Sequence, residues 1–202
     1  MIELYKKTAL NLQPSGISPA VTGILTLIGL VFIVILIPAM PGLLIFQKLA
    51  GVNLFIRNGQ LWRLLTPIFL HTSLGHLLFN SFSLALLGPK AERTLGSLKF
   101  TLLFLLSGIM SNMATFLCRP LTYTHTGASG AIFGILGFYL YSALARRDII
   151  PMRQPSIFYT FIIVSVIASF IQPEVNGIGH LGGLAGGFLL AALFLKERKR
   201  LG

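Results

Sequence analysis

Long runs of uncharged, mostly apolar residues alternate with short charged segments along this chain. No charge lies between Lys7 and Lys48, and residues 20–37 are the most apolar part of that run. A helix needs roughly 20 mostly apolar residues to cross a bilayer. The pattern therefore predicts six membrane-spanning helices. Their expected ranges are 20–37, 74–88, 99–118, 128–145, 156–172 and 177–195.

Composition supports a membrane protein. Of the 202 residues, 54% are hydrophobic and only 10% are charged. A soluble domain of this size carries about 25% charged residues, so this chain has too few charges to cover a water-facing surface. We expect an all-α membrane protein, with one domain over residues 1–202 and six transmembrane helices in a bundle.

The segment 38–73, between the first two spans, has a different pattern. Its apolar clusters are broken by Gly and Pro, so it is too interrupted to span a membrane and too apolar for water. We expect short amphipathic pieces that lie in the membrane interface, with Trp62 and Arg63 at headgroup level.

The distribution of Lys and Arg predicts the orientation. If the N-terminus is cytoplasmic, 12 of the 16 lie inside and 4 outside, which follows the positive-inside rule. The inside set is Lys6, Lys7, Lys90, Arg93, Lys99, Arg146, Arg147, Arg153, Lys196, Arg198, Lys199 and Arg200, and the outside set is Lys48, Arg57, Arg63 and Arg119. We expect a multi-pass protein of the plasma membrane with both termini cytoplasmic. The net charge of +11 then faces anionic headgroups, and no nucleic-acid partner is expected.

Polar residues within spans are costly and are candidates for function. His76 and Asn80 are four residues apart on one face of the second span. Ser129 begins the fourth span, and His180 lies a few residues into the sixth. All three even-numbered spans run from outside to inside, so these four side chains are expected at a similar depth near the extracytoplasmic face.

Small residues indicate how these side chains meet. Gly127 and Gly130 flank Ser129, while His180, Gly183 and Gly187 share one face of the sixth span. Small residues let membrane helices approach closely, so we expect Ser129 within hydrogen-bond reach of His180.

A Ser and a His in contact form an activated nucleophile, because the imidazole accepts the hydroxyl proton as the oxygen attacks a carbonyl. The five carboxylates lie on the cytoplasmic side or, for Glu174, in the loop before the sixth span. We therefore expect a dyad, with His76, Asn80 and the Ser129 N–H stabilising the oxyanion. The alternative interpretations are structural: Ser129 would hydrogen-bond the backbone of its own helix, and His180 would hydrogen-bond a neighbouring helix. A metal site is not expected, because no two His have helical i, i+4 spacing.

With these residues the sequence resembles the rhomboid family of intramembrane serine proteases, from about Leu61 to Gly187. The motifs that carry the resemblance are Trp62-Arg63, His71-x4-His76-x3-Asn80, Gly88-x3-Glu92-x3-Gly96, Gly127-Ala-Ser129-Gly130 and Gly179-His180-x2-Gly183-x3-Gly187.

The resemblance implies a rhomboid-like bundle in which Ser129 is the nucleophile and His180 the general base. Gly127 would support the site with Phe133, which stands where many members carry a Tyr stacked on the catalytic His. Trp62, Arg63, His71, Glu92, Gly183 and Gly187 would be structural. No cofactor is implied. The substrates would be single-span membrane proteins that enter beside the fifth span, which acts as a lateral gate.

Two other hypotheses remain open. The chain could be a non-catalytic rhomboid-like protein that binds or escorts membrane clients, although members of that class typically lack the Ser or the His. It could also be an unrelated small transporter, but the repeat symmetry and broken helices typical of transporters are missing.

Overall fold

The structure is a computed structural model that describes residues 18–37, 41–146, 155–171 and 175–196, and its long elements are all helices. These are α2 (Pro19–Leu36), α5 (Leu74–Leu95), α6 (Ser97–Cys118), α7 (Ser129–Ala145), α8 (Pro155–Ile171) and α9 (Gly177–Lys196). The predicted all-helical fold is confirmed, and each predicted span overlaps one of these helices. Within the described residues, α2, α6 and α9 are long and apolar enough to cross a membrane, while α7 and residues 162–171 form shorter apolar helices.

Short elements fill the segment between α2 and α5. They are α3 (Gly42–Leu49), β1 (Gly51–Val52), α4 (Asn53–Arg57), and two short 3-10 helices, η1 (Leu61–Leu64) and η2 (Thr66–Phe69). The expected short pieces are short helices and a strand here, while their position in the membrane interface stays a prediction. Residues 38–40 lie outside the described part. The sequence did not predict a strand, yet β1 pairs antiparallel with β2 (Thr124–His125). This pairing joins the segment to the loop that leads into α7.

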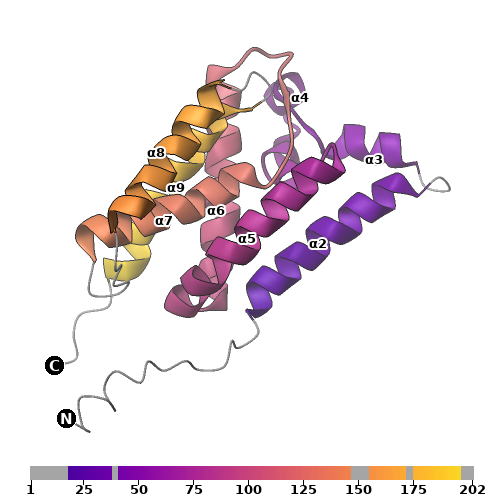
Figure 1. Cartoon of the computed structure of the whole chain (residues 1–202). Helices are drawn as coiled ribbons and strands as arrows, with labels where there is room; N and C mark the ends of the chain where they lie inside the picture. The colour runs from indigo at the N-terminus through magenta and orange to yellow at the C-terminus, as the bar shows by residue number, and fades with distance from the viewer. Residues whose placement is uncertain (1–17, 38–40, 147–154, 172–174, 197–202) are drawn as a thin grey trace, which may run out of the picture.

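The bundle is built around α7. All of its residues from 130 to 139 are buried, and it contacts α5, α6, α8 and α9. A helix that is apolar on every side belongs in the interior of a bundle. Figure 1 shows α2 beside α5 on one side of the bundle, and α8 beside α9 on the other. The start of α7 therefore lies between two pairs of helices.

Glycines bring α7 and α9 into backbone contact. A Cβ at Gly183 would collide with the carbonyl oxygen of Gly130, and a Cβ at Gly187 would collide with that of Gly134. Only hydrogen atoms at these positions allow the two helices to lie so close. The predicted close approach of these spans along a glycine face is confirmed.

Arg63 holds the segment between α2 and α5 in place. One guanidinium nitrogen donates to the carbonyl of Gln47 at 2.8 Å and to that of Ala50 at 2.5 Å. Trp62 is half exposed and donates its indole N–H to the carbonyl of Lys48. Arg63 itself is buried, and its guanidinium is satisfied by backbone carbonyls. This is consistent with the expected structural role, while its depth at headgroup level stays a prediction.

Glu92 anchors the start of α2. Its buried carboxylate accepts hydrogen bonds from the backbone N–H groups of Ala20 at 2.9 Å and Val21 at 3.0 Å, and from the Ser97 hydroxyl at 2.7 Å. The first N–H groups of a helix have no partner within it, and a negative charge there is also favoured by the helix dipole. Glu92 thereby connects the α5–α6 turn to α2.

Candidate active site

Ser129 is the first residue of α7, and this position leaves its polar groups available. Buried hydroxyls elsewhere in the bundle, such as those of Ser107 and Ser142, donate to the carbonyl four residues back in their own helix. Ser129 has no helical residue four positions before it. Its backbone N–H is also outside the helical hydrogen-bond ladder. Both the hydroxyl and the N–H of Ser129 can therefore serve a reaction.

The turn before Ser129 depends on Gly127. Its φ of +108° lies in the region that side chains rarely adopt, and its N–H donates to the carbonyl of Pro67 at 2.8 Å. The space where a Cβ would stand is taken by the ring of His76, whose Nε2 would lie 2.5 Å from it. Gly127 thus satisfies two requirements, the backbone conformation and the packing of His76.

His180 lies in the first turn of α9 and points toward Ser129. Its Nε2 is 2.9 Å from the Ser129 hydroxyl oxygen, and its ring stacks on Phe133 with 4.1 Å between centroids and 15° between planes. Asn176 caps this helix by accepting the N–H of Gly179 and donating to the Thr115 hydroxyl. The cap ties the start of α9 to α6 and so fixes where His180 stands.

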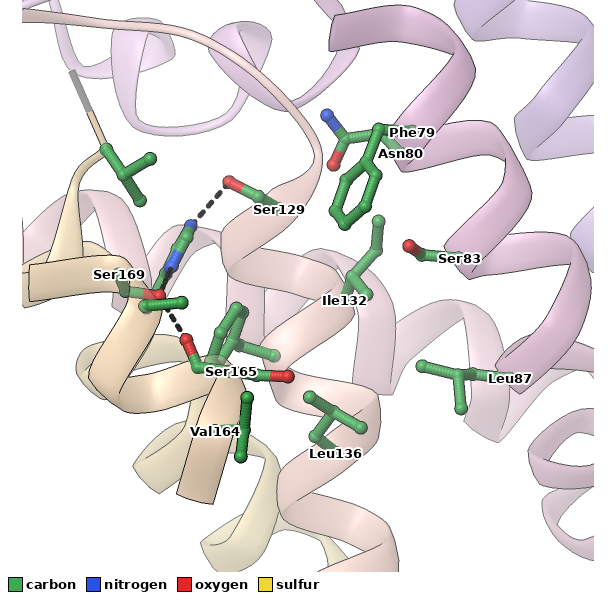
Figure 2. Close-up of a pocket in the computed structure, with 14 residues that line it drawn as sticks. Phe79, Asn80, Ser83, Leu87, Ser129, Ile132, Leu136, Val164, Ser165 and Ser169 are labelled. Carbon is green, nitrogen blue, oxygen red and sulfur yellow. Dashed lines mark hydrogen bonds between the residues drawn. The ribbon is translucent and has the colours of Figure 1, made fainter. Parts of the chain in front are cut away.

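Ser169 on α8 was not among the residues selected from the sequence. Its hydroxyl oxygen lies 2.7 Å from Nδ1 of His180, so a polar group contacts each ring nitrogen (Figure 2). A Ser in an apolar span normally bonds its own helix, and Ser169 also does so, by donating to the carbonyl of Ser165. The only sequence signal was a hydroxyl near the C-terminal end of the fifth predicted span, which carries no information about its partner.

His76 and Asn80 lie on α5, across from Ser129. Asn80 is buried and donates one amide N–H to the carbonyl of His76 at 2.9 Å, which leaves its second N–H available. His76 is half-buried, and its backbone N–H is capped by the Ser73 hydroxyl. Both side chains border a cavity of about 630 Å³ that also contains Ser129 and His180.

A second cavity of about 250 Å³ shares Asn80, Ser129 and His180 with the first and extends toward α8. Figure 2 shows Phe79 and Asn80 of α5 facing Ser129, with Ser165, Ser169 and Val164 of α8 on the opposite wall. Its walls are mostly apolar, whereas the larger cavity is lined by several hydroxyl, amide and imidazole groups. Ser129 therefore stands where a more polar space meets a largely apolar one.

The other two histidines lie at the edge of the site. His71 packs edge-on against His76, with 4.8 Å between ring centroids. His125 belongs to β2 and packs on Gly51, and its burial lowers the pKa of its imidazole to about 4. Within the described residues no three His, Cys, Asp or Glu side chains are grouped as metal ligands would be. The acids Glu3, Asp148, Glu174 and Glu197 lie outside the described part.

Comparison with known proteins shows which family the chain resembles. Residues 58–197 match the family model of the Rhomboid domain. The chain is 42% identical over 182 residues to the "Putative rhomboid protease YdcA" of Bacillus subtilis, covering 90% of this chain and 92% of that protein. It is also 42% identical to the rhomboid protease GluP of the same organism and 32% identical to RHOMBOID-like protein 1 of Arabidopsis thaliana. These alignments cover 71% and 77% of this chain but only 28% and 40% of those proteins.

The apolar helices and these relatives together define a multi-pass membrane protein. Within that class, the chain belongs to the rhomboid family.

Proposed function

We propose that this chain is an intramembrane serine endopeptidase that hydrolyses peptide bonds in or near the transmembrane segments of other membrane proteins. Its relatives are named as rhomboid proteases, which supports peptide-bond cleavage. The observation that carries the proposal is the distance of 2.9 Å between the Ser129 hydroxyl and Nε2 of His180, at the border of two cavities. In this proposal Ser129 and His180 act as a dyad, and no carboxylate takes part.

The reaction follows from these two side chains. As the Ser129 oxygen bonds to the substrate carbonyl carbon, its proton moves to Nε2 of His180. The imidazolium then gives this proton to the amine that leaves when the peptide bond breaks. A water molecule next loses a proton to Nε2 and attacks the acyl-enzyme, and the proton returns to the Ser129 oxygen. The stack on Phe133 keeps the ring plane fixed through these transfers.

Negative charge on the carbonyl oxygen needs hydrogen-bond donors. The N–H of Ser129, the free amide N–H of Asn80 and the ring of His76 are the candidates beside this position. Loss of one such donor lowers turnover by roughly a hundredfold to a thousandfold in a well-studied serine protease. The amide of Asn80 is already oriented by its bond to the carbonyl of His76, so it would not reorganise during the reaction.

The two cavities fit a substrate segment that enters from the bilayer and a hydrolytic water molecule that enters from the aqueous side. The more polar cavity suits the hydrolytic water, and the apolar cavity suits side chains of a single-span membrane protein. Phe79 on α5 is 74% exposed and borders both cavities. We propose that a substrate helix enters between α5 and α8, so that α8 acts as the lateral gate.

The same proposal includes the topology. Six spans in the plasma membrane would put both termini in the cytoplasm and the site toward the extracytoplasmic side. Lys90 and Arg93 lie near the C-terminal end of α5 and Lys99 lies at the start of α6, at the opposite end of α5 from His76. This distribution supports a cytoplasmic turn and an extracytoplasmic site. The terminal charges used in the count lie outside the described residues.

The test is cleavage of a model single-span substrate by the purified chain in liposomes. Wild type should cleave it, while Ser129→Ala and His180→Ala should not. Asn80→Ala should cleave it more slowly but measurably. Equal cleavage by all of these variants would exclude the dyad, and loss of activity with a chelator would indicate a metal instead. Binding of the substrate without cleavage by wild type would support the escort hypothesis.

A further inference from the structure

The Ser169 hydroxyl lies between two hydrogen-bond partners that differ in whether they can donate or accept. Its oxygen lies 2.7 Å from the carbonyl oxygen of Ser165 and 2.7 Å from Nδ1 of His180 (Figure 2). Both distances are those of good hydrogen bonds. The side chain is 5% exposed, so water does not replace either partner freely.

The single proton of this hydroxyl can serve only one of these contacts. The Ser165 carbonyl can only accept, so the Ser169 proton must point to it if both contacts are hydrogen bonds. The Ser169 oxygen then accepts from Nδ1, which must carry a proton. In a neutral imidazole the other nitrogen, Nε2, is then unprotonated, and it is this nitrogen that faces the Ser129 hydroxyl at 2.9 Å. If Ser169 instead donated to Nδ1, the Ser165 carbonyl would lose this donor. Nε2 would then carry the ring proton and could not act as a base for Ser129.

We infer that Ser169 is a positioning residue for His180: it accepts the Nδ1–H and thereby keeps the Nε2 lone pair directed at Ser129. This inference rests on the proposed function. It assigns to an uncharged hydroxyl on α8 the orienting task that a carboxylate performs in a catalytic triad.

The same contact acts during the reaction. When Nε2 takes the Ser129 proton, the imidazole becomes a cation with a proton on each nitrogen. Its Nδ1–H still donates to Ser169, and a hydrogen bond to a charged group is stronger than one to a neutral group. Ser169 therefore stabilises the protonated ring more than the neutral one and accelerates the step. No proton is transferred to Ser169.

The matched variants lie on one helix. Ser169→Ala removes the acceptor, whereas Ser165→Ala removes a hydroxyl one turn away on the same cavity wall and keeps the carbonyl that Ser169 uses. Ser169→Thr restores a hydroxyl at the same position. We expect Ser169→Ala to lower kcat on the order of tenfold to a hundredfold with KM little changed. Ser165→Ala alters the same cavity wall without touching the His180 ring, so it should lower kcat far less than Ser169→Ala does. Ser169→Thr should recover most of the loss.

Two readouts separate this role from a merely structural one. The first is the rate at which a fluorophosphonate probe labels Ser129, which needs no substrate docking and should fall with kcat in Ser169→Ala. The second is the ¹⁵N NMR signal of the His180 ring in the wild-type protein at neutral pH, which should report a proton on Nδ1 and none on Nε2. A wild-type ring protonated on Nε2 would overturn the inference, even if Ser169→Ala does not fold.

The outcome also distinguishes this inference from the proposed function. If wild type neither cleaves substrate nor labels at Ser129, the proposed function fails. If wild type is active and Ser169→Ala labels and turns over at the wild-type rate, the dyad stands and the role of Ser169 is wrong. Equal losses in Ser165→Ala and Ser169→Ala would also overturn it, because they would show an effect of the cavity wall instead of the Nδ1 contact.

Discussion

The ring of Phe133 lies nearly parallel to the imidazole of His180, with 4.1 Å between centroids. Phe133 is on α7, four residues after Ser129, so one helix carries both the hydroxyl that meets the imidazole edge and the ring that covers its face. We expect Phe133→Leu, which keeps most of the volume but loses the flat face, to lower kcat severalfold, since an aromatic stack contributes about 1 kcal/mol. Phe133→Tyr should retain activity, measured as substrate turnover in liposomes. Wild-type turnover in Phe133→Leu would contradict a role for the stack.

We expect that Gly127 tolerates no side chain, and a control variant can separate the effect of backbone strain from that of the clash with His76. Gly127→Ala introduces both a strained positive φ, which costs about 1–2 kcal/mol, and a clash with the His76 ring. Gly59→Ala is the matched control, because Gly59 has a φ of +90° and nothing within 4 Å of the added Cβ. Both variants should lose stability from the backbone strain, Gly127→Ala should lose more because of the clash, and only Gly127→Ala should abolish labelling of Ser129. Equal labelling in the two variants would mean that displacement of His76 does not matter.

The contact between α7 and α9 should control the distance from Ser129 to His180. Gly183→Ala places a methyl group against the backbone of Gly130, so the helices must separate and activity should fall at least tenfold. Gly186→Ala is the control on the same helix, since the three atoms nearest to its added Cβ belong to the side chain of Met110 and not to the backbone of α7. Cleavage rates and thermal unfolding of both variants test this. Full activity in Gly183→Ala would show that the helices need no direct backbone contact.

The carboxylate of Glu92 should stabilise the fold without taking part in the chemistry. Glu92→Gln replaces one acceptor oxygen with an NH₂ group that faces the N–H of Ala20 or Val21, and it should lower the free energy of unfolding by about 1–3 kcal/mol. Thr94→Ala, near Glu92 on α5, removes a hydroxyl that donates to the carbonyl of Lys90 in its own helix and should have little effect. The free energies of unfolding of the two variants and of wild type, measured in detergent, test this prediction. A variant as stable as wild type would remove Glu92 from the anchoring role.

His125 should make the fold sensitive to acid. Burial lowers the pKa of His125 from its ordinary 6.5 to about 4, so the folded protein holds it neutral while the unfolded chain protonates it below about pH 6.5. Stability is therefore complete above pH 6.5 and falls as the pH drops toward 4, by up to roughly 3 kcal/mol from this group. His125→Gln should lose less stability than wild type between pH 7 and pH 5, measured by thermal unfolding in detergent. The same pH dependence in both proteins would assign the acid sensitivity to other groups.

The sequence by itself determined the helices and the pairing of Ser129 with His180. Apolar runs select helices because backbone groups in a bilayer must be satisfied within their own segment, and this is a local property. Ser129 and His180 could be paired from the sequence because helix direction sets their depth and glycines mark the faces that pack together.

Only the tertiary structure decided which other polar groups these residues meet. Ser169 contacts His180 because α8 turns one particular face toward α9, and an apolar span has no sequence pattern that marks this face. The burial of Arg63 and the pairing of β1 with β2 likewise depend on carbonyls and strands supplied by distant segments. Hydrogen bonds of this kind depend on position in space, whereas helix formation depends on neighbouring residues, and that difference separates what could be predicted from what could not.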